Sequence, residues 1–297
     1  RLVQLAIPFC VPVPLIAVWM LRTQGSEAHV QSTSVSFGPF VDRFSHLASQ
    51  ATGIDFFWPI ASPLLAGAIV LAPWFLGLRM TRNPTRWAMF LATCAVFFGF
   101  PHYALGTAFL YQRFGGLVLI FWLMLWSAPS TDQASDRRWR ELLVMAVVVV
   151  IGCFNVLRFS AFDAENAHFT RVLSAMEPGR RVASVVSQFR SDQFSNPVYL
   201  HHALWYQVGA KGVVDFNFAF FFPQLVRYRA EAAPPFGDRF AWDPFAYSWS
   251  QFNGDAYDYF LFHGPPNAPA RFFRNRLGSV TLVAQSGAWS VYQRISE

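Results

Sequence analysis

Apolar residues fill long blocks in the first half of the chain and give way to short alternating runs after about residue 159. A helix that crosses a hydrocarbon core of about 30 Å needs about 20 mostly apolar residues. Five blocks approach or reach this length, at residues 2–21, 56–78, 87–104, 109–128 and 139–159. The pattern predicts an α-helical transmembrane bundle of about five spans over residues 1–159. The third and fourth spans are the least regular, because residues 106–114 could instead form a re-entrant turn.

Residues 160–297 have the pattern of a domain that folds in water. A helix is expected from Ser160 or Asp163, whose side chains suit an N-cap, to the stop signal Pro178-Gly179. Further segments alternate between strand and helix character, at residues 181–186, 199–208, 212–215, 257–262 and 268–276. Two last strands, 279–284 and 289–294, flank the turn at residues 285–287. The second half is therefore predicted to be a small α/β domain with a terminal hairpin.

The composition also indicates that the two halves of the chain fold in different solvents, the first in a membrane and the second in water. The chain is 54% hydrophobic and only 13% charged, whereas soluble domains carry roughly 25% charged residues. The net charge of +6 is almost entirely arginine, with Lys211 as the single lysine. Since many of these arginines stand in short loops between apolar blocks, the charge indicates membrane topology and no nucleic-acid partner is expected.

The arginines in two short loops predict which side of the membrane each loop occupies. One loop holds Arg79, Arg82 and Arg86, and another holds three more arginines at residues 137, 138 and 140. Basic residues in short loops mark the cytoplasmic side, and five alternating spans would put both groups on one face. We therefore expect residues 22–55, residues 102–113 and everything after 159 to lie outside the cytoplasm.

This layout, together with several local phrases, resembles the C-terminal half of a bacterial polytopic glycosyltransferase of the GT-C superfamily. The phrases are Tyr111-Gln112-Arg113-Phe114 at the opening of a span, the helix, turn and strand over residues 162–182, and the closing strand at 289–294. The resemblance covers the whole chain in layout. It implies a multi-pass protein of the bacterial inner membrane whose C-terminal domain is periplasmic or extracellular.

The resemblance implies transfer of a sugar from a polyprenyl-phosphate donor to a glycan or lipid acceptor outside the cytoplasm. The general base would be an acid upstream of Arg1, and any divalent cation would be bound there as well, so no metal site is expected in this chain. Arg113 is the expected ligand of the lipid phosphate, with His102, Tyr111 and Gln112 beside it, because guanidinium pairs well with phosphate oxygens. The alternative is that Arg113 only reaches the headgroups.

Two further groups of polar residues are candidates for acceptor binding. Asp42, Arg43 and His46 lie in the first outer loop, on a predicted amphipathic helix at residues 37–51 that could also rest on the membrane without a chemical role. The second group, Asp255, Asp258 and His263, flanks a predicted strand, where carboxylates also act as turn formers.

Other constellations have structural alternatives. The acids Asp163 and Glu165 suit the first turn of a helix as well as metal chemistry. The phenylalanine-rich residues 216–223 are typical of a core or an aromatic belt, and also of a platform for a sugar or lipid.

A function of a different class, a non-catalytic scaffold or exporter component of cell-envelope assembly, fits the same topology. Glycine-rich phosphate loops, nucleophile elbows, zinc spacings and redox cysteine pairs are absent from the sequence. The common classes of soluble enzyme are thereby excluded.

Overall fold

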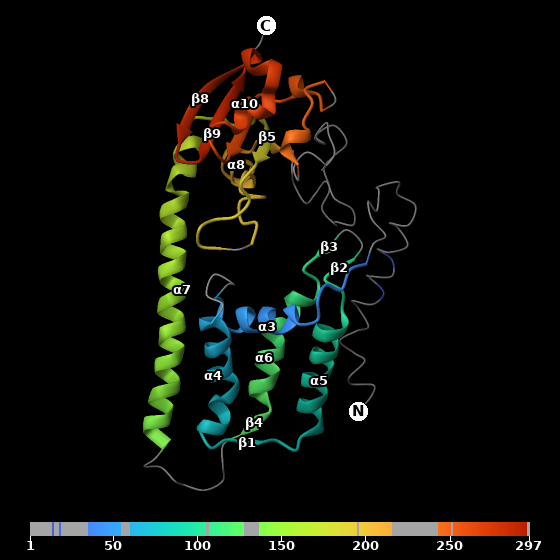
Figure 1. The fold of residues 1–297 in the computed structure, drawn as a ribbon, viewed down its shortest axis with the longest axis vertical. Helices are drawn as coiled ribbons and strands as arrows, with labels where there is room; N and C mark the ends of the chain where they lie inside the picture. The colour runs from blue at the N-terminus through green and yellow to red at the C-terminus, as the bar shows by residue number, and fades with distance from the viewer. Residues whose placement is uncertain are drawn as a thin grey trace.

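The computed structural model shows a group of helices, one long helix beside them, and a sheet domain at the far end of that helix (Figure 1). The residues that the structure describes are 14, 18, 35–54, 60–104, 107–127, 137–194, 196–215, 243–250 and 252–295. Apart from residues 14 and 18, the first predicted span, residues 2–21, lies outside this part of the chain, as do the phenylalanine-rich residues 216–223.

Three helices stand side by side, and a fourth lies across their ends (Figure 1). The standing helices are α4 (Ala61–Phe75), α5 (Pro84–Gly99) and α6 (Gly115–Met124), and the crossing helix is α3 (Asp42–Thr52). Helix α5 begins where Asn83 caps it, its side chain accepting a hydrogen bond from the Thr85 amide, with Pro84 in the first turn. The amphipathic helix predicted at residues 37–51 is thus confirmed, starting five residues later.

Short strand pairs join these helices at their two ends. Strand β1 (Arg79–Met80) pairs with β4 (Trp126–Ser127) at the end opposite α3, and β2 (Tyr103–Ala104) pairs with β3 (Thr107–Ala108) at the α3 end. The 3-10 helix η2 (Tyr111–Phe114) leads from the second pair into α6. The two ends of the helical region therefore carry different connections.

Helix α7 (Arg137–Leu173) is continuous over 37 residues, or about 55 Å. The sequence prediction of a span ending at residue 159 and a new helix starting at Ser160 or Asp163 is therefore wrong. Neither residue caps a helix, since both lie inside α7. No proline or glycine occurs between Gly152 and Pro178, so nothing interrupts the backbone hydrogen bonds between the apolar and the polar half.

The predicted bundle of about five spans is also wrong. Among the helices in the described ranges, α7 alone is long and apolar enough to cross a membrane, judged by length and composition over residues 138–173. Helices α4, α5 and α6 have 15, 16 and 10 residues, against the roughly 20 that a typical bilayer requires.

The backbone explains why hydropathy overestimated these lengths. Helix α4 ends at Phe75, and the positive φ of Gly77, 70°, turns the chain within the predicted span 56–78. The block at residues 109–128 is divided into η2, α6 and the strand β4. The block at 87–104 likewise ends in strand β2. The predicted spans were too long because the residues in these turns and strands are also apolar, and a hydropathy average cannot distinguish them from helix.

The second half contains a five-stranded mixed sheet in the order β6-β5-β7-β9-β8. Its strands are β5 (Arg181–Val186), β6 (Val213–Val214), β7 (Tyr259–His263), β8 (Val280–Ser286) and β9 (Trp289–Arg294). Strand β5 runs parallel to β6 and β7, while β9 pairs antiparallel with β7 and β8. The α/β sheet and the terminal hairpin expected from the sequence are present, with strand boundaries within two residues of those predicted.

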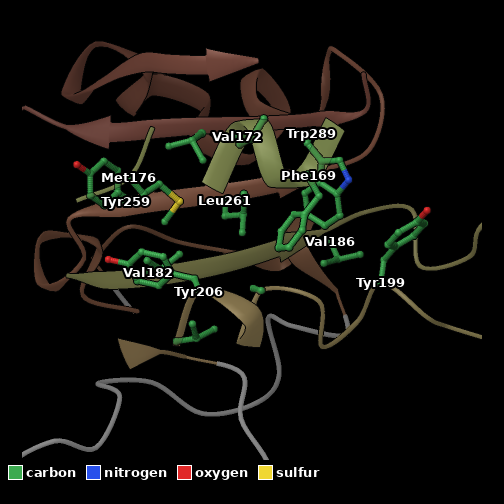
Figure 2. Close-up of a cluster of buried hydrophobic side chains, with 13 residues drawn as sticks. Phe169, Val172, Met176, Val182, Val186, Tyr199, Tyr206, Tyr259, Leu261 and Trp289 are labelled. Atoms are coloured by element: carbon green, nitrogen blue, oxygen red, sulfur yellow. The ribbon is translucent and has the colours of Figure 1, made fainter. Parts of the chain in front are cut away.

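Both faces of the sheet are covered. Figure 2 shows Phe169 and Val172 of α7, and Met176 in the turn that follows it, packed with residues of the sheet and with Tyr206 of α8 (Leu204–Ala210). On the opposite face, α10 (Ala268–Phe273) packs its two terminal phenylalanines against Phe260 and Phe262. Because α7 ends against this core, one continuous helix runs from the helical region into the sheet domain.

Candidate functional site

The helical region has one basic end and one end where the candidate site residues gather. At the basic end, Arg86 donates to the Met124 carbonyl oxygen at 3.1 Å, and Arg140 donates to the Phe75 carbonyl oxygen at 3.3 Å. The described arginines of both short loops, including Arg79, thus lie at the β1–β4 end, and the α/β domain lies beyond the α3 end (Figure 1). We call these the arginine end and the α3 end.

Arg43 is the central buried group of the α3 end, with its side chain 2% exposed. Its guanidinium donates to the carbonyl oxygens of Phe97 at 2.5 Å, Phe100 at 2.8 Å and Phe37 at 3.2 Å. It also lies 4.1 Å from the centre of the Tyr111 ring, within the range of a cation–π contact. Arg43 therefore ties α3 to the carboxyl end of α5 and fixes Tyr111.

Tyr111 and His46 form a hydrogen-bonded pair, with 2.5 Å between the Tyr111 hydroxyl and His46 Nδ1. Burial lowers the pKa of His46, and the Arg43 charge lowers it further, while Asp42 acts in the opposite direction. Burial also raises the pKa of Tyr111. The neutral imidazole is therefore favoured, and in the tautomer protonated at Nε2 the tyrosine hydroxyl donates to Nδ1.

Gln112 and His102 form a second pair. Gln112 Nε2 lies 2.7 Å from His102 Nδ1. The amide can donate to this nitrogen, which places the proton of a neutral His102 on Nε2. Gln112 Oε1 is buried and has no hydrogen-bond partner among the residues that the structure describes. The pair thus has both a donor and an acceptor left for other groups.

Arg113 differs from its neighbours because its side chain is exposed. Within the described ranges it makes no hydrogen bond or ion pair. A guanidinium that is not committed to the protein can bind an anion through two parallel hydrogen bonds. Asp42, exposed in the first turn of α3, is the acidic group at the edge of the cluster.

The structure therefore joins two groups that the sequence treated separately. Five of the candidates interact directly with one another, and Asp42 and Arg113 adjoin them in the chain. The interacting residues are Arg43, His46, His102, Tyr111 and Gln112. Sequence reasoning missed Phe97, which is fully buried, accepts from Arg43 and packs its ring 5.3 Å from Tyr111. No sequence signal distinguishes this phenylalanine from the other aromatic residues of its block.

The candidates of the α/β domain do not gather in the same way. Asp258 precedes β7 and its Oδ2 accepts from the Arg181 amide at 2.9 Å. His263 ends the same strand, is 3% exposed and donates from Nδ1 to the Gln188 carbonyl oxygen at 2.8 Å. Asp255 lies in a 3-10 turn, Gly254–Ala256. Asp258 and His263 are thus held at opposite ends of one strand.

His263 belongs to an aromatic group with His202, and neither ring is free to titrate near neutral pH. The His263 ring packs 4.0 Å from Tyr199 and 4.4 Å from Trp289, and His202 stacks on Trp289 at 5.6 Å. Burial lowers the pKa of each histidine to about 4. Both are core residues that fold in the neutral form.

A polar contact that the sequence did not single out joins α7, α3 and the α/β domain. Asn155 Nδ2 donates to the Thr52 carbonyl oxygen at 2.9 Å, and Arg158 donates to the Gly53 carbonyl oxygen at 2.6 Å. Arg158 also donates to the Gln193 carbonyl oxygen at 2.7 Å and lies over the Phe194 ring. The sequence signal that could have identified this contact is the pair Asn155 and Arg158, two polar residues three positions apart at the end of an apolar stretch.

A small cavity lies among the described residues of the α/β domain. This cavity, of about 20 Å³ beside Gly264 and Trp289, has room for roughly one water. No group of three or more histidine, cysteine, aspartate or glutamate residues is placed to hold a metal ion among the described residues. Asp163 and Glu165 lie inside α7, more than 25 residues after its start at Arg137, so the predicted first-turn position for them is wrong.

Comparisons with known proteins find no counterpart. No family model matches the chain, and neither a curated protein nor a solved structure matches it. Any assignment of function therefore depends on the chemistry of the α3 end.

Proposed function

We propose that the chain is part of a membrane glycosyltransferase that takes a sugar from a polyprenyl-phosphate donor and passes it to a glycan or lipid acceptor outside the cytoplasm. The observation that carries this proposal is the uncommitted, exposed Arg113 beside the His102–Gln112 and His46–Tyr111 pairs. A lipid phosphate remains at the membrane surface, so its protein ligand must be a cation at that level.

A membrane location is supported by the surface of α7. Its most apolar 18-residue window has a mean hydropathy of 2.5, and 6% of that window is buried within the protein. Leu142, Leu157 and Val156 are each about two-thirds exposed. An apolar helix surface of this extent needs an apolar solvent. We propose that α7 crosses the bilayer, with the arginine end in the cytoplasm and the α3 end outside.

The groups at the α3 end have two roles: some would bind the phosphate, and others hold the site in place. Arg113 would pair with two phosphate oxygens, while the Nε2 proton of His102 is available for a third contact. Arg43 and His46 act on the protein itself, since they fix the ring and the hydroxyl of Tyr111. The resemblance to the GT-C superfamily assigns the general base to an upstream segment, so no base is proposed from these residues.

The test is binding of a polyprenyl phosphate, undecaprenyl phosphate, to the full chain in lipid nanodiscs. Replacing Arg113 with Ala should weaken binding at least about tenfold, because hydrogen bonds to charged groups contribute roughly 1.5–3 kcal/mol. Arg113→Lys should recover part of the loss, since it keeps the charge but not the paired geometry.

The matched control is Arg82→Ala, which removes an exposed arginine from the opposite end. It should leave the affinity unchanged. Equal affinities of the Arg113→Ala variant and the unmodified chain would contradict the lipid-phosphate proposal and favour the scaffold alternative.

A further inference from the structure

The apolar stretch of α7 is fixed at both ends by polar contacts to the helices beside it. At the arginine end, Arg140 donates to the carbonyl oxygen of Phe75, the last residue of α4. At the other end, Asn155 and Arg158 donate to the carbonyl oxygens of Thr52 and Gly53, where α3 ends. The polar groups of neighbouring elements therefore meet α7 at two defined heights.

Arg158 cannot move its charge far from this height. Long cationic side chains often reach out of the membrane and extend the apparent length of a span. However, Arg158 is 7% exposed, and its two terminal nitrogens are bound to the carbonyl oxygens of Gly53 and Gln193. Its guanidinium also stacks 4.7 Å from the centre of the Phe194 ring. The outer limit of the apolar stretch is thus set by the fold.

The distance between the two limits is short. Residues 142–157 of α7 contain no charged residue, and at 1.5 Å per residue they span about 24 Å. Helix α4, which packs along this part of α7, has 15 residues and spans about 22 Å. A typical hydrocarbon core is about 30 Å thick.

We infer that this surface fits a bilayer about 24 Å thick in its hydrocarbon core, and that the protein thins a thicker membrane around α7. The inference rests on the membrane location in the proposed function. Arg158 cannot leave this level without losing its hydrogen bonds to the Gly53 and Gln193 carbonyl oxygens, whereas a bilayer adjusts its thickness around a short apolar surface at modest cost. Lipid headgroups would then approach the level of α3 and its site.

The experiment reconstitutes the full chain in phosphatidylcholine with two monounsaturated chains of increasing length, from dimyristoleoyl through dipalmitoleoyl and dioleoyl to dierucoyl. The temperature of unfolding should be highest in the two shorter lipids and about 4 °C lower or more in dierucoyl lipid. A maximum in dioleoyl or longer lipid would overturn the inference.

A variant moves the outer limit. In Arg158→Leu the uncharged stretch runs from residue 142 to 162, or about 31 Å, so the optimum should shift toward dioleoyl lipid. Arg171→Leu is the control, because it removes an exposed arginine from the same helix beyond the apolar stretch and should not move the optimum. If the Arg158 variant does not fold, the lipid series on the unmodified chain still decides.

The outcomes separate this inference from its premise. Release of the protein from membranes by alkaline carbonate would contradict the proposed membrane location. Retention in the membrane with an optimum in long-chain lipid would contradict the thin-bilayer fit alone.

Discussion

The helical region and the α/β domain use the same apolar side chains in opposite ways. In the domain, Val182, Phe260 and Val291 are completely buried between sheet and helices. In the helical region, Leu64 of α4 and Leu142 of α7 are about 70% exposed, and α7 presents such residues around its circumference. The difference shows that apolar content alone does not locate a core. The domain buries its apolar side chains against one another, whereas α7 exposes most of its own on the surface of the protein.

The sharpest test compares one buried and one exposed apolar residue. Phe260→Ala should destabilise the α/β domain by about 3–5 kcal/mol, because it leaves a cavity between Phe272, Phe273 and Trp249. Leu142→Ala on α7 should cost under about 0.5 kcal/mol in a membrane, where no cavity forms. Urea titration of the full chain in nanodiscs measures both. Similar costs at the two positions would remove the distinction between the regions.

Acid should destabilise the α/β domain through its two buried histidines. The folded-state pKa of His202 and His263 is about 4, below the unfolded value near 6.5. The unfolded chain therefore binds more protons between these values, and stability that is complete above pH 6.5 is lost as pH falls toward 4. At pH 5 the cost is on the order of 1–2 kcal/mol per histidine.

Thermal unfolding followed by near-ultraviolet circular dichroism at pH 7.5 and pH 5 measures this loss. His202→Phe keeps an aromatic ring against Trp289 and Phe169 and should remove about half of the pH dependence. An unchanged pH dependence in this variant would show that other groups control the acid sensitivity of the domain.

The smallest predicted effect concerns the contact between α3 and α7. Gly53 has φ 68°, and a Cβ there would lie 2.9 Å from Asn155 Oδ1, whereas Gly77 has φ 70° and nothing within 4 Å. Both Gly→Ala changes should cost about 1 kcal/mol for the left-handed backbone. Gly53→Ala should cost roughly 1 kcal/mol more, since it disturbs Asn155 and the bond to Thr52. Equal unfolding free energies would mean that the α3–α7 contact adjusts without loss.

Local signals predicted much of the α/β domain. Strand β5 was predicted with its observed boundaries, and the hairpin of β8 and β9 followed from alternation around Gly287, whose φ of 55° needs a turn residue. These features depend on neighbours in the chain. The continuity of α7 was missed because Ser160 and Asp163 are good caps in isolation, although nothing near them ends the helix.

The candidate site could be predicted only in pieces. Arg43 and His46 were proposed for one role and Tyr111 for another, but His46 bonds to a partner 65 positions away and Arg43 to one 54 positions away. A single sequence does not show which residues far apart in the chain contact each other in the fold. The predicted number of spans was wrong for a related reason, because a hydropathy average does not detect turns such as the one at Gly77.

The unbroken course of α7 links the direction of its apolar half to the position of the α/β domain. Arg158 holds α7 at one point along its length, since it donates hydrogen bonds to the Gly53 carbonyl oxygen at the end of α3 and to the Gln193 carbonyl oxygen of the α/β domain. About 22 Å of helix separate it from Leu173, which adjoins the domain core. A change of about 10° in the direction of this helix segment about Arg158 would displace Leu173 sideways by about 4 Å.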